Sequence, residues 1–171
     1  MYYGLLCALP ALPDEVGPPV PPVADVAEKV MDALDLGGIQ IAAALLQMRN
    51  LEPEREAWAL WFEQLEDLAR EHRSAWLAEF ADFECSLRRS LAHRRGGPPV
   101  PDSGRHRALL QALDSADPLA VERGLDRARL SAMSTSGFGR DAVFAYLAAS
   151  LVLERWASPD GDPSNLSEVL R

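Results

Sequence analysis

The sequence predicts an all-α fold: an elongated antiparallel helical bundle with a short extended segment at its N-terminus. Apolar residues recur at helical spacing over most of the chain, and no pattern of paired strands is evident. Helix-start signals, a capping residue followed by proline or by an apolar run, precede several of these stretches. With 171 residues, of which 48% are hydrophobic, the chain is long enough to bury a core.

The N-terminal residues are apolar and lead into a proline-rich stretch. We expect residues 1–10 to form a buried strand or extended piece, because the run is too short to span a bilayer and lacks the basic region of a signal peptide. The six prolines of residues 10–22 predict an extended connection on the bundle surface. Cys7 and Cys85 are interpreted as buried free thiols. This usage favours a reducing compartment and a cytoplasmic protein.

Two helices are predicted after the prolines. The first covers residues 24–34, and its inward positions are Val23, Val26, Val30 and Leu34. Residues 35–38, D-L-G-G, are expected to break it. A second, alanine-rich helix covers residues 39–48, and residues 49–52 form a turn before Pro53.

A long amphipathic stretch follows over residues 54–95. It is either one helix of about forty residues, roughly 60 Å at 1.5 Å per residue, or two helices that meet near Ser74. Ser74 is a suitable N-cap, which favours the break. The aromatic side chains of this stretch are most simply core, although part of the series could form a partner groove, since tryptophan is a common interface anchor. The series comprises Trp58, Trp61, Trp76, Phe80 and Phe83.

The Gly- and Pro-rich residues 96–104 are the clearest linker. They divide the chain into an N-terminal helical part, residues 1–95, and a C-terminal helical part, residues 105–171, that packs on the first. Helices are predicted at 105–113, 118–133 and 142–156, with a short terminal helix at 166–171. Asp117 and Asp141 are the expected caps of the second and third of these helices. The last long helix is expected to point Phe144, Leu147, Leu151 and Trp156 inward.

The stretch of residues 117–129 carries more ordered charge than a solvated helix face needs. Glu122 lies four residues before Asp126, a like-charge spacing that is unfavourable unless a cation compensates. We expect Arg155 or Arg88 to supply that cation and to fix how the C-terminal helices cross. The predicted internal charge network comprises Glu84, Arg88, Glu122, Asp126, Arg129 and Arg155.

Other acidic residues, including the pair Asp82 and Glu84, lie along helices in the manner of exposed faces. Gly124 interrupts a predicted helix at a cost of about 1 kcal/mol relative to alanine. A close approach of another helix would explain this glycine, and so would drift.

Charge argues against nucleic acid as a partner. The net charge is −9 and lies mostly in residues 1–70, whereas residues 88–107 hold six arginines against one aspartate. This basic patch either complements the end of a helix or docks an acidic partner protein. The candidate partner contacts are Arg89, Arg94 and Arg95.

Nothing in the sequence argues for catalysis, a metal ion or a cofactor. None of the three histidines stands at the spacing of a di-iron or zinc-protease motif. His72 lies on an apolar helix face and is interpreted as a core histidine with a satisfied hydrogen bond, rather than a ligand. His93 and His106 flank the linker and are expected in solvent. Residues 137–140, G-F-G-R, resemble a phosphate loop only faintly and are interpreted as a connection between helices.

Four motifs carry a resemblance to a known family. They are Tyr2-Tyr3-x-x-x-x-Ala8-Leu9-Pro10, Phe83-Glu84-x-x-Leu87-Arg88-x-x-Leu91-Ala92-x-Arg94, Asp117-Pro118-Leu119-x-x-Glu122-x-x-Leu125-Asp126-Arg127-Ala128-Arg129 and Leu153-Glu154-Arg155-Trp156. In this order they resemble an uncharacterised family that is encoded within bacterial V/A-type ATPase operons. That family is in turn similar to a shortened form of the all-helical socket protein of V/A-type ATPases.

The resemblance implies a mechanical role without catalysis. The socket joins the rotating central shaft to the membrane rotor ring of a proton- or sodium-translocating ATPase. The implied partners are the shaft and ring proteins, and the implied location is the cytoplasmic face of the membrane, without insertion into it. An assembly factor or stator-side adaptor of the same complex stays open. So do an unrelated helical interaction protein and a small enzyme with a site between Trp58 and His72.

Overall fold

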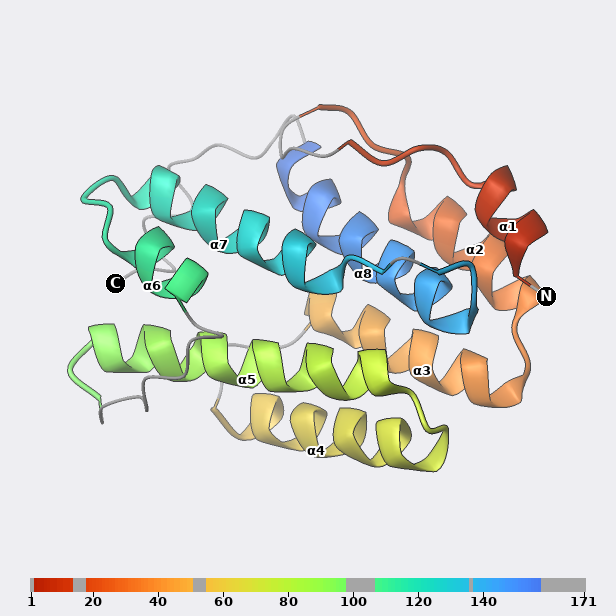
Figure 1. The fold of residues 1–171 in the computed structure, drawn as a ribbon, viewed down its shortest axis with the longest axis horizontal. Helices are drawn as coiled ribbons and strands as arrows, with labels where there is room; N and C mark the ends of the chain where they lie inside the picture. The colour runs from red at the N-terminus through yellow and green to blue at the C-terminus, as the bar shows by residue number, and fades with distance from the viewer. Residues whose placement is uncertain (1, 14–17, 51–54, 98–106, 136, 158–171) are drawn as a thin grey trace.

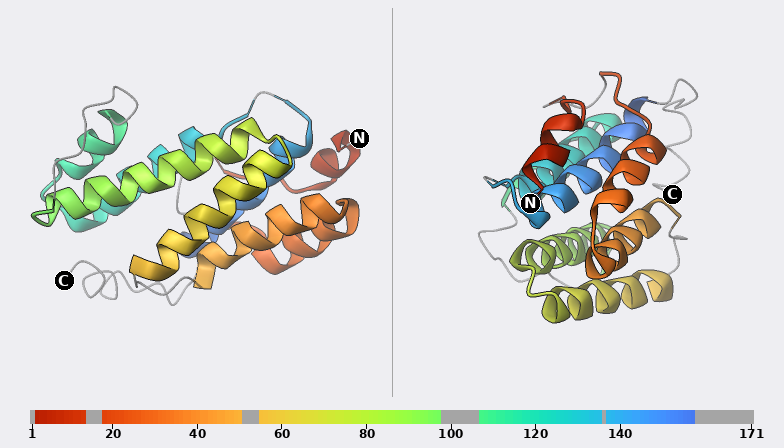
Figure 2. Two further views of the ribbon diagram at one scale, coloured as in Figure 1. Left: turned by 90° about the horizontal axis from the view of Figure 1, so that it is seen from below. Right: turned by 90° about the vertical axis from the view of Figure 1, so that its right-hand side faces the viewer.

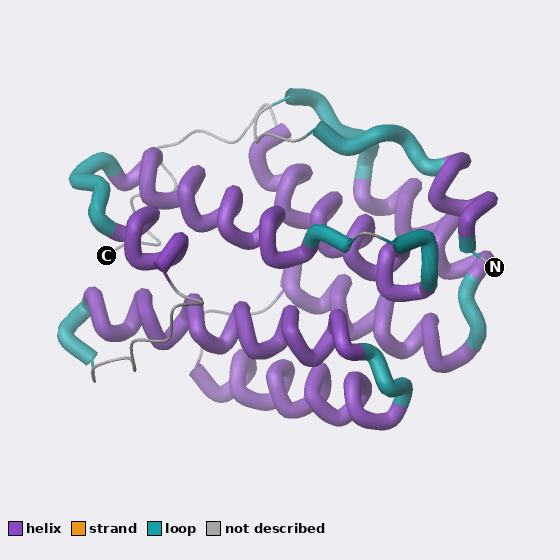
Figure 3. The backbone as a smooth tube through the Cα atoms, viewed as in Figure 1, coloured by secondary structure: helices purple, strands orange, loops and turns teal. Residues whose placement is uncertain are grey.

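The protein is built from helices, and the part of the chain that the structure describes contains no strand (Figure 3). The structure is a computed structural model, and it describes residues 2–13, 18–50, 55–97, 107–135 and 137–157. The α-helices are α1 Tyr3–Ala8, α2 Val23–Ala33, α3 Leu36–Gln47, α4 Arg55–Glu71, α5 Ala75–Arg94, α6 Arg107–Leu113, α7 Pro118–Met133 and α8 Arg140–Ala157. A 3-10 turn, Met48–Asn50, continues α3. The all-α class predicted from the sequence is confirmed.

Helix α8 lies in the middle of the bundle although it is the last of the described helices along the chain (Figure 1). It packs against α2, α3, α5 and α7, while α4 covers the outer side of α3 and α5 (Figures 1 and 2). Three helix pairs, α2 with α3, α4 with α5, and α6 with α7, are joined by short connections. The bundle is therefore not a simple row of sequential neighbours, because its centre is supplied by a helix from near the end of the chain.

The buried apolar side chains form two separate clusters. The larger cluster joins α2, α3, α4, α5 and α8, and Met133 at the end of α7 also belongs to it. The smaller cluster joins the second half of α5, α6 and the first part of α7. Its buried members are Leu87, Leu109, Leu113, Val121, Leu125 and Ala128. Helices α5 and α7 run through both clusters and so connect them.

The break in the long amphipathic stretch falls where the sequence favours it. Helix α4 ends at Glu71 and α5 begins after Ser74. The Ser74 Oγ accepts a hydrogen bond of 3.1 Å from the Leu77 backbone N–H, which makes Ser74 the N-cap of α5. Arg73 has a φ of 52°, a left-handed conformation that lets the chain reverse between the two helices.

The N-terminal segment departs from the prediction of a buried strand. Residues Tyr3–Ala8 form the helix α1, and none of its residues is buried. Since no described segment offers it a strand to pair with, the segment satisfies its backbone hydrogen bonds internally as a helix. The backbone becomes extended at Leu9, the residue before Pro10, which agrees with the conformational preference of a residue that precedes proline. Cys7 lies on this helix and is exposed, so its predicted burial is wrong.

Two helix starts also differ from their predictions. Residues 35–38 do not break the chain: Asp35 caps α3, and its Oδ1 accepts a hydrogen bond of 2.8 Å from the Gly38 N–H. Asp141, the expected cap of the last long helix, lies in its first turn, after Arg140. Its Oδ1 accepts a hydrogen bond of 2.9 Å from the Ser74 hydroxyl and thereby joins α8 to the start of α5.

Some predictions concern residues outside the described part of the chain. These are the terminal helix at 166–171, most of the linker at 96–104, and His106. Among the helices that the structure describes, none combines the length and the apolar character needed to cross a bilayer.

Candidate functional site

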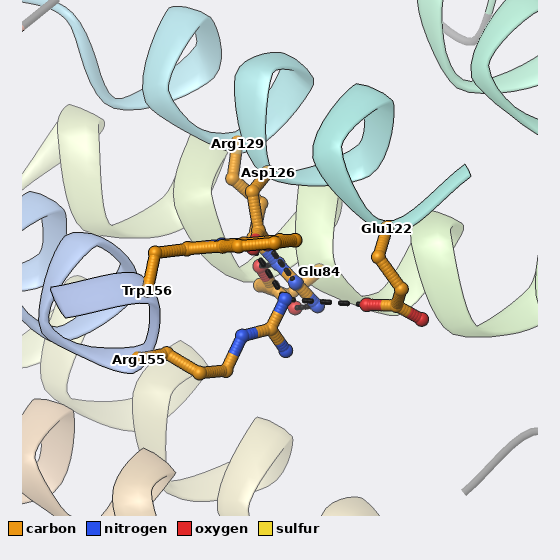
Figure 4. Close-up of polar contacts among 6 residues, drawn as sticks. All are labelled: Glu84, Glu122, Asp126, Arg129, Arg155 and Trp156. Atoms are coloured by element: carbon orange, nitrogen blue, oxygen red, sulfur yellow. Dashed lines mark hydrogen bonds and ion pairs between the residues drawn. The ribbon is translucent and has the colours of Figure 1, made fainter. Parts of the chain in front are cut away.

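Charged residues from α5, α7 and α8 converge in the interior (Figure 4). We call this group the charge network. It comprises Glu84, Glu122, Asp126, Arg129, Arg155 and Trp156. The network includes five of the six residues that the sequence places together, and Trp156 takes the place of Arg88.

Arg129 joins two buried carboxylates on different helices. Its Nε donates to Glu84 Oε1 at 2.7 Å, and its Nη1 donates to Asp126 Oδ1 at 2.6 Å. The Glu84 and Asp126 side chains are both 0% exposed. Burial by itself lowers the pKa of Arg129, but the two carboxylates and their hydrogen bonds outweigh this effect and raise the pKa above its ordinary value. Arg129 is therefore charged at every practical pH.

Asp126 is the hub of the charge network. One oxygen accepts from Arg129, and the other accepts from Arg155 Nη2 and from the Trp156 indole N–H, the latter at 2.6 Å. Arg155 Nη2 also donates to Glu122 Oε2 at 3.2 Å. Arg155, and not Arg88, is thus the cation that compensates the Glu122–Asp126 repulsion.

Glu84 corrects the prediction of an exposed acidic face. Its helix has only a weak apolar stripe, so spacing alone does not separate its buried polar positions from its solvated ones. The carboxylate is buried because Arg129 reaches it from α7, with bonds to both oxygens. A buried charge of this kind requires a partner from another helix, which the sequence of one helix does not reveal.

The motif at the end of α8 has a further role that sequence reasoning missed. Glu154 Oε1 accepts a hydrogen bond of 2.9 Å from the backbone N–H of Val23, the first residue of α2. The preceding residue, Pro22, provides no side-chain cap, so Glu154 satisfies this helix start from 131 positions away. Its second oxygen lies 3.5 Å from Arg49 Nη1. The missing cap at Pro22 was a signal that a remote acceptor was needed.

Arg88 lies beside the charge network but is not paired with it. Its guanidinium carbon lies 3.0 Å from the ring centroid of Trp58, a stacked cation–π contact. Its Nε is buried and has no hydrogen-bond partner among the described residues. Burial lowers the pKa of Arg88 to about 10, with Glu84 opposing this shift and Arg129 adding to it.

An open pocket of about 790 Å³ lies next to Arg88 and the end of α8. The side chains that matter for its chemistry are Met48, Arg49, Trp58, Arg88, Glu154 and Arg155. A second pocket of about 580 Å³ lies between the N-terminal segment, α7 and α8. Tyr3 and Phe138, two exposed aromatic residues near this second pocket, pack edge to face at 5.2 Å.

The three arginines predicted as partner contacts are exposed near the C-terminal end of α5. Arg94 Nη2 donates to the backbone oxygen of Ser115 at 3.2 Å, which joins the end of α5 to the connection between α6 and α7. Arg95 also has an interaction partner. Arg89 is exposed on the same helix.

The aromatic series is mainly core. Trp61, Trp76 and Phe80 are buried, and the two indole N–H groups donate to backbone oxygens of α3 and α7. Trp58 and Phe83 are half-buried. Trp58 is the member of the series that borders the open pocket beside Arg88.

His72 is half-buried, as expected for a residue on an apolar face, but its Nε2 is buried without a hydrogen-bond partner among the described residues. The predicted satisfied hydrogen bond is therefore wrong for this ring nitrogen. The ring packs so tightly on Gly37 that a Cβ there would lie 2.5 Å from His72 Cε1. The backbone oxygen of His72 accepts a hydrogen bond from Arg140, which attaches the start of α8 to the α4–α5 turn.

Among the described residues, no group of three or more His, Cys, Asp or Glu side chains is arranged to hold a metal ion. Comparison with known proteins found no matching family model, no matching curated protein and no matching solved structure.

Proposed function

We propose that the protein is a non-catalytic, socket-like component of a V/A-type ATPase or ATP synthase, linking the central rotor shaft to the membrane ring. The observation that supports this proposal is the convergence of three separate sequence motifs in one place. Glu84 comes from the first, Glu122, Asp126 and Arg129 from the second, and Arg155 and Trp156 from the third. Residues that carry the resemblance are therefore those that hold α5, α7 and α8 together.

A linking protein of this kind must transmit force without changing shape. Ion pairs between helices fix their relative rotation and register, since each guanidinium must meet its carboxylate in a narrow range of geometry. The charge network supplies such fixed points where α5, α7 and α8 meet. In this proposal the motifs preserve the shape of the linker, and the partner surfaces lie outside the network.

The proposal is tested by purifying the protein together with the shaft and ring proteins of its own ATPase. We expect stoichiometric association with the intact complex, retained through size-exclusion chromatography. Association only with partial complexes favours an assembly factor instead. The absence of any association with shaft or ring proteins contradicts both.

A further inference from the structure

Arg88 is a half-buried cation without a counter-charge in the described part of the chain. No hydrogen bond or ion pair to another described residue involves its guanidinium, and its buried Nε has no acceptor there. Leaving a buried polar group of a charged side chain unsatisfied costs free energy. An unmet cost of this kind at a pocket wall indicates a group that is satisfied by binding.

The neighbouring carboxylates are already occupied. Both oxygens of Glu84 accept from Arg129, and both oxygens of Asp126 accept from other residues of the charge network. Arg88 therefore remains as one surplus positive charge beside a network whose own charges are paired. One surplus cation matches one carboxylate.

The stacking on Trp58 determines how an acceptor can approach. The indole covers one face of the guanidinium at 3.0 Å, so a ligand in the pocket meets its N–H edge or its other face. The edge of a guanidinium presents parallel N–H groups that fit the two oxygens of a carboxylate. The stack also holds the fork in one orientation, which reduces the entropy lost on binding.

The rest of the pocket suits a segment of protein. Its walls combine apolar side chains, among them Met48, Leu151 and Val152, with Arg49 and Arg155 at 58% and 44% side-chain exposure. A tryptophan and an arginine in a concave site are the residue types that most often carry the binding energy of interfaces. The exposed arginines provide an electrostatic field that steers an acidic partner toward the pocket.

We propose that this pocket receives an acidic side chain of a partner protein, flanked by apolar residues, and that Arg88 binds its carboxylate. This inference deepens the proposed function and rests on it, because the partner would be another protein of the same ATPase. It moves the partner contact from Arg89, Arg94 and Arg95 at the end of α5 to the pocket between α4, α5 and α8.

The first test uses two blocked tripeptides, acetyl-Leu-Glu-Leu-amide and acetyl-Leu-Gln-Leu-amide, and inorganic phosphate as separate titrants of the full-length protein. We expect the glutamate peptide to shift the NMR signals of the Trp58 indole N–H and the Arg88 Nε–H in a saturable manner. The glutamine peptide and phosphate should bind at least about tenfold more weakly. Equal binding of the glutamine peptide, equal binding of phosphate, or no binding of the glutamate peptide each overturns the proposal.

Three variants separate binding from folding. Arg88→Met should lose the peptide-induced shift of the Trp58 indole, whereas the matched control Arg89→Met, one residue along the same helix, should keep it. Arg88→Lys keeps the charge but loses the planar fork, so its affinity should be intermediate. Arg88→Met should still fold, because it removes an unpaired cation; its melting curve checks this. Retained binding in a folded Arg88→Met protein contradicts the assignment, and if that variant does not fold, Arg88→Lys decides: unchanged affinity overturns the proposal.

A second test uses the ATPase complex. Arg88→Met should weaken association with the partner proteins, while Arg89→Met should leave it unchanged. The two tests fail independently: peptide binding without any ATPase association refutes the proposed function and leaves the pocket assignment standing. Normal association of Arg88→Met with the complex refutes the pocket as the ATPase contact and leaves the proposed function standing.

Discussion

Arg129 and Arg88 have the same side chain and lie close to the same carboxylates, yet their surroundings give them opposite properties. Arg129 is bonded to Glu84 and Asp126, and its pKa is raised. Arg88 is partly desolvated without a hydrogen bond to a described residue in return, and its pKa is lowered to about 10. At the scale of single residues, the geometry of the partner therefore decides whether a buried charge stabilises the fold or remains available for binding.

The first prediction concerns Arg129. Arg129→Met removes the cation between two fully buried carboxylates and should lower the free energy of unfolding by about 3–5 kcal/mol. Urea denaturation measures the change, and Arg127→Met, an exposed position on the same helix, is the control and should cost less than about 0.5 kcal/mol. Adding Glu84→Gln to Arg129→Met should recover part of the loss. A cost for Arg129→Met as small as that of the control would contradict a structural role for this arginine.

At the scale of helices, contacts from remote residues determine where elements begin and how closely they approach. Helix α2 starts under Glu154, and α5 starts at Ser74, which is bonded to Asp141 of α8. Helices α6 and α7 meet at Gly124, where an added Cβ would lie 2.8 Å from the Cβ of Ala112. A close helix–helix approach thus accounts for the glycine inside α7, which the sequence alone leaves open.

The second prediction follows from that approach. Gly124→Ala should destabilise the protein by about 1–3 kcal/mol, because the clash with Ala112 outweighs the better helix propensity of alanine. Ala112→Gly in the same chain removes the atom in the way, so the double variant should be more stable than Gly124→Ala alone. Thermal denaturation of the three variants measures this coupling. A stabilising Gly124→Ala substitution would show that α6 can move aside freely.

The third prediction separates the two contacts of Glu154. Glu154→Gln keeps an oxygen for the Val23 N–H and loses only the ion pair to the 58% exposed Arg49, so its cost should be below about 1 kcal/mol. Glu154→Ala removes both contacts and should cost about 1 kcal/mol more. Hydrogen exchange of the first amides of α2 reports the lost cap. Equal costs and equal exchange in both variants would exclude a capping role.

At the scale of the whole molecule, the charge network lies between the two apolar clusters. On α5, Ala81 belongs to the larger cluster and Leu87 to the smaller, with Glu84 between them. On α7, Leu125 and Ala128 belong to the smaller cluster and Met133 to the larger, with Arg129 between them. The network therefore joins two separately packed parts of one bundle.

The fourth prediction concerns the relative stability of these parts. Helix α6 and the first half of α7 pack in the smaller cluster, so their amides should exchange with solvent through an opening of lower free energy than those of α8. Native-state hydrogen exchange at increasing denaturant resolves the two openings. Arg129→Met should widen the gap between them, because it removes a link between the clusters. A single opening shared by α6 and α8 would contradict this division.

Much of the fold could be predicted because it depends on local patterns. Helix α7 has the predicted bounds, and α2 and the Ser74 break follow their expected signals to within a residue. The N-terminal segment could not be predicted this way, since a short apolar run is compatible with either a strand or a helix and the presence of a pairing strand decides between them. The burial of Glu84 and the role of Glu154 likewise depend on helices distant in sequence.

The sequence by itself therefore determined the helical class, most helix positions and most residues of the charge network, because helical periodicity, caps and charge spacing act over a few residues. Tertiary structure alone decided which arginine meets which carboxylate. Arg155 reaches Glu122 and Arg129 reaches Glu84 because α8 and α5 both pack on α7, and Arg88 is left facing a pocket. Pairing between side chains dozens of residues apart is set by helix packing, which local spacing does not encode.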